Sequence, residues 1–204
     1  MAGHPGRSAL SPTVVLASQS PRRHELLRSI GLEFRVEAAD VDESWHADED
    51  PIAYVERVAR SKAETIADRL GHPADTVVIA ADTTVDVDGQ IFAKPTDDDD
   101  ARRMLRLLSG RTHQVHTAVF CWAATGVHVD TATTEVTFVR LTDELIDWYL
   151  SMGEHRDKAG AYAMQGAAGA LVSRISGSPS NVIGLPLAST VTLLGRCGAP
   201  LAAR

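Results

Sequence analysis

Residues 13–27 read Thr-Val-Val-Leu-Ala-Ser-Gln-Ser-Pro-Arg-Arg-His-Glu-Leu-Leu, and they predict a strand that passes through a tight loop into a helix. The apolar, β-branched run over 13–17 is typical of a buried strand. Ser20 is a preferred N-cap residue and Pro21 a preferred first helical residue, so the helix is expected to start there and to end at Gly31. A strand followed closely by a helix indicates an α/β fold.

The first turn of this helix carries Arg22 and Arg23, although the backbone N–H groups already make that end of a helix positive. Two guanidinium groups beside the hydroxyls of Ser18 and Ser20 become favourable when a polyanion binds, and phosphate is the commonest one in biology. The start of the helix therefore predicts a binding site for a phosphorylated small molecule. The alternative is that both arginines point to solvent or pair with surface acids such as Glu25.

The composition limits the classes of function. The 204 residues include 44% hydrophobic side chains, enough for one large domain, which we expect over residues 13–204. A formal net charge of −7 gives no general reason to bind nucleic acid or an anionic membrane surface. Residues 1–12 are rich in Gly, Pro and Ser and lack an apolar run, so they are interpreted as a disordered leader.

Two further absences point to a cytoplasmic protein. Cys121 and Cys197 have neither metal-ligand nor redox spacing, which favours two reduced thiols. No stretch is long and apolar enough to predict a membrane span.

A lysine interrupts the apolar stripe of the next predicted helix. Asp50 as N-cap and Pro51 as first residue should open this helix after an acidic loop over 40–50. Lys62 lies on the apolar stripe, four residues after Val58. Its side chain either faces the interior or snorkels to solvent at the edge of the stripe.

An acidic residue follows the next predicted strand, the apolar run over 76–81. Asp82 comes directly after this run, and we expect it at the carboxyl end of the strand, where open α/β sheets place their ligand crevice. Asp88-Gly89 between two alternating runs predicts a hairpin that delivers Lys94 to the same region.

The four acids over 97–100 resemble a metal cluster, but we interpret them as a helix start. Acids complement the dipole in a first turn, and Asp98 with Arg102 and Asp99 with Arg103 have the spacing of helical ion pairs. A second hairpin is expected over 114–139, and the alternation of helices with hairpins indicates a mixed sheet.

Together the unusual side chains form one chemical set that suits a nucleoside triphosphate. Cations and the helix start can neutralise a triphosphate, carboxylates can hold Mg²⁺ through oxygen, and a carboxylate such as Asp82 can activate a water molecule. Spacing alone does not say which bond is broken, because the chain has neither a P-loop nor a glycine-rich dinucleotide motif. The set consists of Arg22, Arg23, Lys62, Lys94, Ser18, Ser20, Glu43, Asp82 and Gln165.

The sequence resembles the Maf-like nucleoside triphosphate pyrophosphatases, formerly described as septum formation inhibitors. The resemblance runs from Val14 to about Leu194 and is carried by these motifs: Leu16-Ala-Ser-Gln-Ser-Pro-Arg-Arg23, Ala81-Asp-Thr83, Lys94-Pro95, Leu108-Ser-Gly110 with His113, Lys158-Ala-Gly-Ala-Tyr162, Gln165-Gly166 and Asn181-Val-Ile-Gly-Leu-Pro186. It implies a two-lobed α/β fold, similar to that of inosine triphosphatases, with a mixed twisted sheet, flanking helices and a central cleft. It also implies a cytoplasmic hydrolase that needs Mg²⁺ or Mn²⁺ and cleaves the triphosphate to monophosphate and pyrophosphate, and it suggests a homodimer.

The resemblance also implies roles for individual residues. Asp82 would accept a proton and contact the metal, and Glu43 would be a second acid near the metal. The phosphates would be held by Ser18, Arg23, Lys62 and Lys94.

Three positions that distinguish the subfamilies are Arg22, Thr83 and Gln165, a combination that looks like the dTTP/UTP type. The relative that acts on 7-methyl-GTP carries Trp and Gln at the first two. A side-chain amide such as that of Gln165 can pair with the edge of a pyrimidine. Thr84 and Ala163-Met164 depart from the usual Val and Gly-Ile, which bears on base selectivity more than on the reaction.

Two other functions compete with a pyrophosphatase. One is a nucleotide-binding regulator of septum formation or cell division in which turnover is incidental. The other is a phosphatase that releases orthophosphate. Paired acids beside the cations favour the enzyme over the regulator, since a sensor has little use for them.

Overall fold

The computed structural model describes residues 12–46, 49–199 and 201, so residues 1–11 of the predicted leader lie outside the described part. Its strands are β1 (Thr13–Leu16), β2 (Arg35–Val36), β3 (Thr76–Val87), β4 (Gln90–Phe92), β5 (Thr112–Ala123), β6 (Gly126–Phe138) and β7 (Val172–Ser176). Its α-helices are α1 (Pro21–Ser29), α2 (Pro51–Leu70), α3 (Asp98–Leu108), α4 (Asp143–Ser151), α5 (Pro179–Ile183) and α6 (Leu187–Arg196). Two 3₁₀ helices, η1 (Ala159–Ala161) and η2 (Ala167–Leu171), precede β7.

The strands form one mixed sheet of seven strands. Its order is β2-β1-β3-β5-β6-β7, and β4 pairs with the end of β3. β1 lies parallel to both β2 and β3, whereas β3, β5, β6 and β7 pair antiparallel. The mixed α/β architecture expected from the sequence is confirmed.

The prediction that a strand ends at Ala81 was wrong. β3 continues through Asp82 and Thr83 to Val87, because β5 pairs with it along that whole length. The neighbour that ends is β1, whose last residue Leu16 pairs with Ile79. Asp82 therefore lies just beyond the carboxyl end of β1, in the middle of a long strand.

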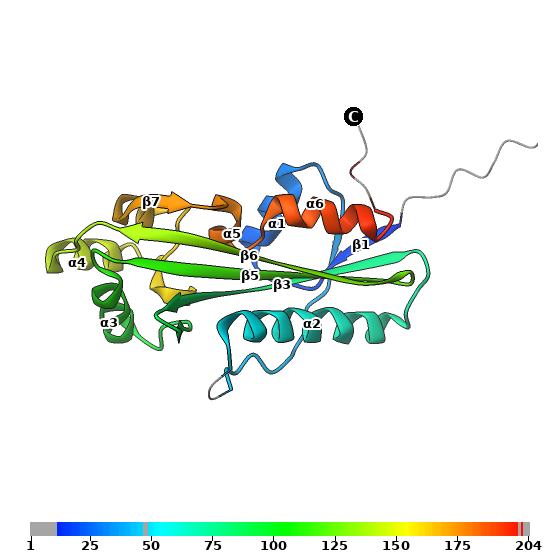
Figure 1. The fold of residues 1–204 in the computed structure, drawn as a ribbon, viewed down its shortest axis with the longest axis horizontal. Helices are drawn as coiled ribbons and strands as arrows, with labels where there is room; N and C mark the ends of the chain where they lie inside the picture. The colour runs from blue at the N-terminus through cyan, green and yellow to red at the C-terminus, as the bar shows by residue number, and fades with distance from the viewer. Residues whose placement is uncertain (1–11, 47–48, 200, 202–204) are drawn as a thin grey trace, which may run out of the picture.

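Helices cover both faces of the half of the sheet that contains β1. Figure 1 shows α2 along one face and α1 with α6 on the other. The apolar stripe of α2 packs on Val78, Ala80 and Phe120, among others. Leu27 of α1 and Leu193 of α6 pack on the opposite face. We call this half the proximal lobe.

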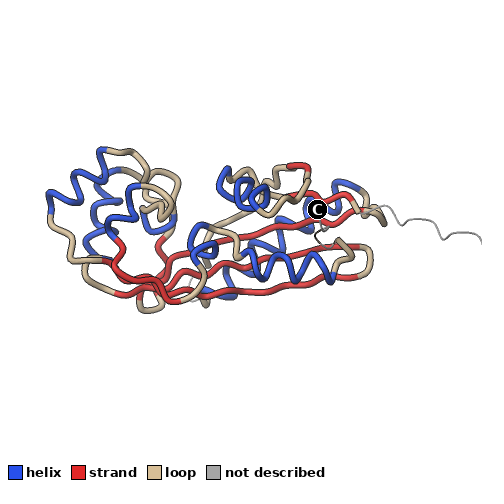
Figure 2. Tube along the Cα trace, turned by 90° about the horizontal axis from the view of Figure 1, so that it is seen from above, coloured by secondary structure: helices blue, strands red, loops and turns tan. Residues whose placement is uncertain are grey.

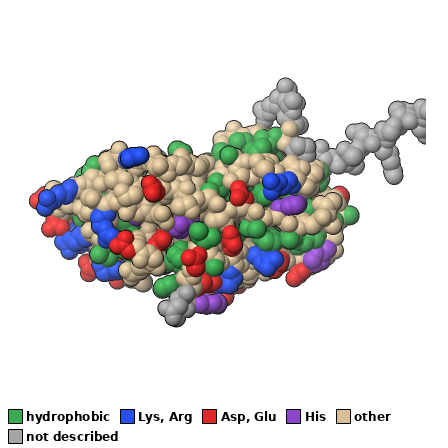
Figure 3. Space-filling model, viewed as in Figure 1, with side chains coloured by type: hydrophobic (Ala, Val, Ile, Leu, Met, Phe, Trp, Pro, Cys, Tyr) green, Lys and Arg blue, Asp and Glu red, His purple; other side chains and the backbone are tan. Residues whose placement is uncertain are grey.

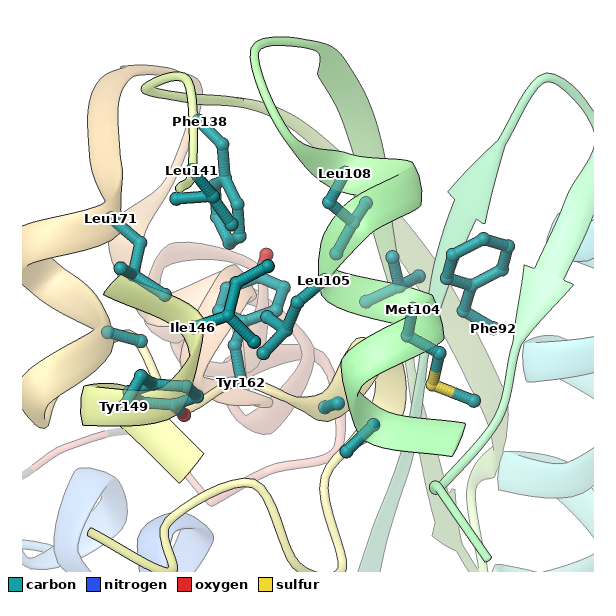
Figure 4. Close-up of a cluster of buried hydrophobic side chains, with 14 of the residues drawn as sticks. Phe92, Met104, Leu105, Leu108, Phe138, Leu141, Ile146, Tyr149, Tyr162 and Leu171 are labelled. Carbon is teal, nitrogen blue, oxygen red and sulfur yellow. The ribbon is translucent and has the colours of Figure 1, made fainter. Parts of the chain in front are cut away.

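The other half of the sheet has a hydrophobic core of its own, which we call the distal core. It is built on the ends of β3, β5 and β6 together with α3, α4 and the 3₁₀ helices (Figure 4). Leu105, Phe138 and Tyr149 are among its fully buried side chains. Figure 2 shows the helices gathered in two groups along the long strands, in keeping with the predicted two-lobed fold.

Several predicted local features are confirmed. Asp50 caps α2 by accepting hydrogen bonds from the N–H groups of Ile52 and Ala53. Asp88 and Gly89 both have positive φ, as the predicted hairpin turn requires. Asp97 caps α3, which confirms that the acids over 97–100 open a helix.

The ion pairs expected along α3 were wrong. Asp98 instead contacts His155, and Arg102 contacts Asp147 of α4. Tertiary partners therefore replace the helical ones at Asp98 and Arg102, whereas Arg103 pairs with Asp100 of the same helix instead of Asp99.

Acidic and basic side chains are interspersed on the face shown in Figure 3, without a continuous basic stripe. Within the described residues, no helix is both long and apolar enough to cross a membrane.

Candidate active site

A cleft of about 1350 Å³ opens between the proximal lobe and the distal core, which together form the two lobes of the molecule. Its walls come from the loop between β1 and α1, the start of α1, the loop before α2, α2 itself, the middle of β3, and the segments around η1 and α5. All the side chains that the sequence singled out line this one cleft: Ser18, Ser20, Arg22, Arg23, Glu43, Lys62, Asp82, Thr83, Lys94 and Gln165.

Lys62 faces inward and bridges two carboxylates. Its Nζ atom lies 2.8 Å from an oxygen of Asp82 and 2.8 Å from an oxygen of Glu43. Only 8% of the lysine side chain is exposed, so the snorkelling interpretation is wrong. The apolar stripe of α2 carries Lys62 to Asp82, and the ammonium group offsets the repulsion between the two acids.

Burial and charge act in opposite directions on the two acids. Burial raises the pKa of Asp82, although the positive charges of Lys62 and Arg23 oppose the rise. Burial also acts to raise the pKa of Glu43, but its hydrogen bond to Lys62 and the charges of Lys62 and Lys94 leave it below the ordinary value. Asp82 is thus more basic than an ordinary aspartate, which suits a proton acceptor, whereas Glu43 is less basic than an ordinary glutamate.

The loop that carries Glu43 is fastened to α2. The hydroxyl of Tyr54 donates to the backbone carbonyl of Glu43 at 2.9 Å. Arg57 donates to both carboxylate oxygens of Glu49 and to the carbonyl of Ser44. These contacts hold Glu43 over the cleft without using its carboxylate.

Arg23 is a buried cation whose direct partners are all neutral. It donates to the Gly184 carbonyl at 2.8 Å, to Ser18 Oγ at 3.2 Å and to Thr83 Oγ1 at 3.1 Å. Burial lowers the pKa of this guanidinium, and the charges of Asp82 and Glu43 act against that effect. A buried positive charge held in place by neutral groups suits an incoming anion.

The remaining predicted residues present unengaged groups to the cleft. Ser20 occupies the N-cap position, but its side chain makes no capping bond, and its N–H donates to Ser18 Oγ. Within residues 12–46 and 49–199, Arg22, Lys94 and Gln165 form no side-chain hydrogen bond or ion pair that would occupy them. The alternative in which Arg22 and Arg23 pair with surface acids was therefore wrong.

The donor set fits a divalent cation that binds together with phosphate. The described residues contain no group of three or more His, Cys, Asp or Glu side chains able to enclose a metal. Carboxylate oxygens of Asp82 and Glu43 nevertheless lie near each other, because both contact Lys62 Nζ at 2.8 Å. Mg²⁺ is commonly held by one or two carboxylates and completed by substrate phosphates and water, and two acids match that pattern.

Sequence reasoning missed several residues of the cleft. Tyr54 lies two turns before Lys62 on the same stripe, so the spacing of α2 could have identified it. Glu154 lies in the charged loop after α4, and its sequence predicts no particular geometry; Lys158 in the same loop belongs to a motif of the family resemblance but was given no place in the cleft. The Gly184 carbonyl that orients Arg23 is a backbone group, which no sequence pattern reveals.

Comparison with known proteins points to one family. The family model described as Maf-like protein matches residues 13–197. A dTTP/UTP pyrophosphatase of Anaeromyxobacter dehalogenans (strain 2CP-1) is 53% identical, over 94% of this chain and 97% of that protein. A dTTP/UTP pyrophosphatase of Hahella chejuensis is 47% identical, over 96% of each chain. Among solved structures, the Staphylococcus aureus Ham1 protein has a TM-score of 0.46 at 19% identity, over 62% of this chain and 71% of that chain.

Proposed function

Since this chain belongs to the Maf-like protein family, we propose that it is a nucleoside triphosphate pyrophosphatase that hydrolyses dTTP and UTP to monophosphate and pyrophosphate. The near-full-length similarity to dTTP/UTP pyrophosphatases supports this function over a binding regulator. The observation that carries the proposal is the cleft itself, where Arg22, Arg23 and Lys94 face the acids that Lys62 bridges.

The cations bind the triphosphate. Arg23 is already fixed by three neutral acceptors, so binding a phosphate there needs little reorganisation of its side chain. Lys94, which follows β4, adds a second positive charge to the cleft, and the hydroxyls of Ser18 and Ser20 line it beside the start of α1. A helix N-terminus adds its free N–H groups to the same site.

Asp82 accepts the proton from the attacking water. The water oxygen forms a bond to the α-phosphorus, the bond between that phosphorus and the bridging oxygen breaks, and pyrophosphate leaves. The proton passes to the Asp82 carboxylate and then to solvent. The raised pKa of Asp82 suits it to this step, and Lys62 holds the carboxylate in place.

A divalent cation, Mg²⁺ or Mn²⁺, would be held by Asp82 and Glu43 together with phosphate oxygens. When bound, it would neutralise negative charge that develops on the phosphates. Glu43 reaches this position through its fastened loop, and its depressed pKa keeps it ionised.

The base is assigned to the end of the cleft formed by Arg22, Thr83 and Gln165. The Gln165 amide offers both a donor and an acceptor, which matches the carbonyl and N–H edge shared by thymine and uracil. Thr83 hydrogen-bonds to Arg23 and to Thr117, so its hydroxyl couples this end to the phosphate end.

A nucleotide panel with product identification tests the proposal. The purified chain is incubated with dTTP, UTP, CTP, dATP and GTP in Mg²⁺ or Mn²⁺, and the products are separated by ion-exchange chromatography. We expect repeated turnover, pyrophosphate as product and a preference for dTTP and UTP. Orthophosphate would indicate a phosphatase, and at most one equivalent of product would indicate a nucleotide-binding regulator.

Two further features belong to the proposal. A cytoplasmic location is supported by the two cysteines, Cys121 and Cys197, which are both free and buried. A homodimer is suggested by the family resemblance, and light scattering on the purified chain would measure the mass in solution.

A further inference from the structure

The segment that presents Gln165 is held at both of its ends. At the first end, the backbone N–H of Ala163 donates to the hydroxyl oxygen of Tyr149 at 3.0 Å. At the second end, the backbone N–H of Ala167 donates to Oε2 of Glu154 at 2.8 Å. Between them the Gln165 side chain is exposed and lines the cleft. Two side chains from α4 and the turn that follows it thus fix the backbone on both sides of one free amide.

Gly166 leaves room for one of these two contacts. A Cβ atom at Gly166 would lie 2.1 Å from Oε2 and 2.6 Å from Cδ of Glu154. The φ angle of Gly166 is −112°, which any residue adopts, so the obstacle to a side chain here is the Glu154 carboxylate and not the backbone. The carboxylate of Glu154 therefore fits directly against the backbone next to Gln165.

We propose that Glu154 is a positioning residue for base recognition, which acts by holding the 163–167 segment so that the Gln165 amide meets the pyrimidine. The inference rests on the proposed function, because it assumes that Gln165 contacts the base. An exposed amide on a loop gains selectivity only when its backbone is fixed, since a free rotation lets it satisfy several bases. Tyr149 supports the other end of the segment, and it lies in the distal core.

Four variants test the role of the carboxylate. Glu154→Ala removes the acceptor, and Glu154→Gln keeps an acceptor oxygen of the same reach. Gly166→Ala leaves Glu154 in the chain but displaces its carboxylate, because the new methyl group would occupy its place. The double variant Glu154→Ala with Gly166→Ala gives the new methyl group room. Glu33→Ala, an exposed glutamate outside the cleft, is the control.

The measurements separate positioning from catalysis. For Glu154→Ala we expect KM for dTTP to rise about three- to tenfold while kcat changes less than twofold, and the preference for dTTP over dATP to fall by the same factor. Gly166→Ala should give the same effect, and the double variant should be no worse than either single one. Glu154→Gln should restore the wild-type preference. Calorimetry with dTMP should show the same loss of affinity without turnover.

The possible failures are distinguishable. If the wild-type chain releases no pyrophosphate from dTTP, the proposed function fails. If the wild type prefers dTTP and Glu154→Ala keeps both its KM and its preference, the positioning role is wrong. A fall in kcat and in melting temperature with unchanged preference would likewise overturn it, because that result indicates a purely structural contact.

Discussion

The two lobes bury polar side chains of different kinds. In the proximal lobe three of the buried polar side chains are charged, and these three, Arg23, Lys62 and Asp82, all line the cleft. In the distal core the buried His113 and Tyr162 are neutral and share a hydrogen bond of 2.9 Å. Burial lowers the pKa of His113 to about 4, which keeps its ring uncharged at neutral pH.

This difference indicates that the buried charges serve function and that the buried neutral groups serve stability. Buried charges weaken a fold unless they are compensated, so their concentration in one lobe indicates that the ligand needs them. Neutral, hydrogen-bonded groups packed among apolar side chains stabilise a fold without binding anything. Substitutions of the buried charges in the proximal lobe should therefore reduce activity, whereas substitutions of apolar side chains in the distal core should reduce stability.

The largest effect is expected for Asp82→Asn. Loss of the proton acceptor should lower kcat for pyrophosphate release by about 10²- to 10⁴-fold. The melting temperature at pH 7 should not fall, because burial disfavours the charge that the substitution removes and Lys62 keeps Glu43 as partner. Exposed Asp130→Asn is the control. Full activity in Asp82→Asn would show that Asp82 is not the proton acceptor.

Leu105→Ala tests whether a substitution in the distal core lowers stability without lowering activity. Leu105 is fully buried, and its truncation should lower the free energy of unfolding by about 2–5 kcal/mol, measured by urea denaturation. Leu107→Ala, on the same helix but 40% exposed, should have a much smaller effect. Well below the melting temperature, kcat/KM of Leu105→Ala should stay within about twofold of wild type. A large loss of kcat/KM in Leu105→Ala would show that the distal core contributes to activity as well as to stability.

Arg23→Lys tests whether the proximal lobe needs only the positive charge of Arg23 or also its hydrogen bonds. Lysine keeps the charge but cannot make the three separate contacts to Gly184, Ser18 and Thr83. We expect KM for dTTP to rise about 10- to 100-fold, measured by initial rates. Arg28→Lys, an exposed substitution on the same helix, is the matched control and should leave KM unchanged. An unchanged KM in Arg23→Lys would mean that a positive charge at this position is enough to bind the triphosphate.

The smallest effect concerns the pH dependence of stability. The pKa of His113 is about 4 in the fold against an ordinary value of 6.5, so on acidification the unfolded chain takes up a proton that the native protein does not. The contribution of His113 to the free energy of unfolding is therefore full above pH 6.5 and decreases as the pH falls towards 4. Between pH 7 and pH 5 the loss should be about 1–2 kcal/mol.

His113→Gln should remove that part of the pH dependence, because glutamine can still hydrogen-bond to Tyr162 but takes up no proton. His46→Gln, an exposed substitution, should leave it unchanged. Urea denaturation at pH 5 and pH 7 measures both variants. If the free energy of unfolding falls by the same amount from pH 7 to pH 5 in wild type and in His113→Gln, then His113 is not buried in its neutral form.

Local sequence patterns predicted most of the elements and the membership of the cleft. Asp50, Asp97 and Asp88-Gly89 act within a few residues of themselves, so their caps and turn could be recognised without the fold. Predictions failed where a partner from elsewhere in the chain intervened. β3 extends past Asp82 because β5 pairs with it, and Asp98 contacts His155 in place of Arg102.

Residue types and local patterns were enough to predict where most strands and helices begin, which cations and acids stand out, and which family the motifs resemble. The mutual geometry of these groups, such as the Lys62 bridge between Asp82 and Glu43 and the contact of Glu154 with the 163–167 segment, came from the folded chain. The two kinds of feature differ in the sequence distance between the groups that interact. Caps, turns and stripes depend on neighbours within a few residues, whereas ion pairs and backbone contacts across a cleft depend on how distant segments pack.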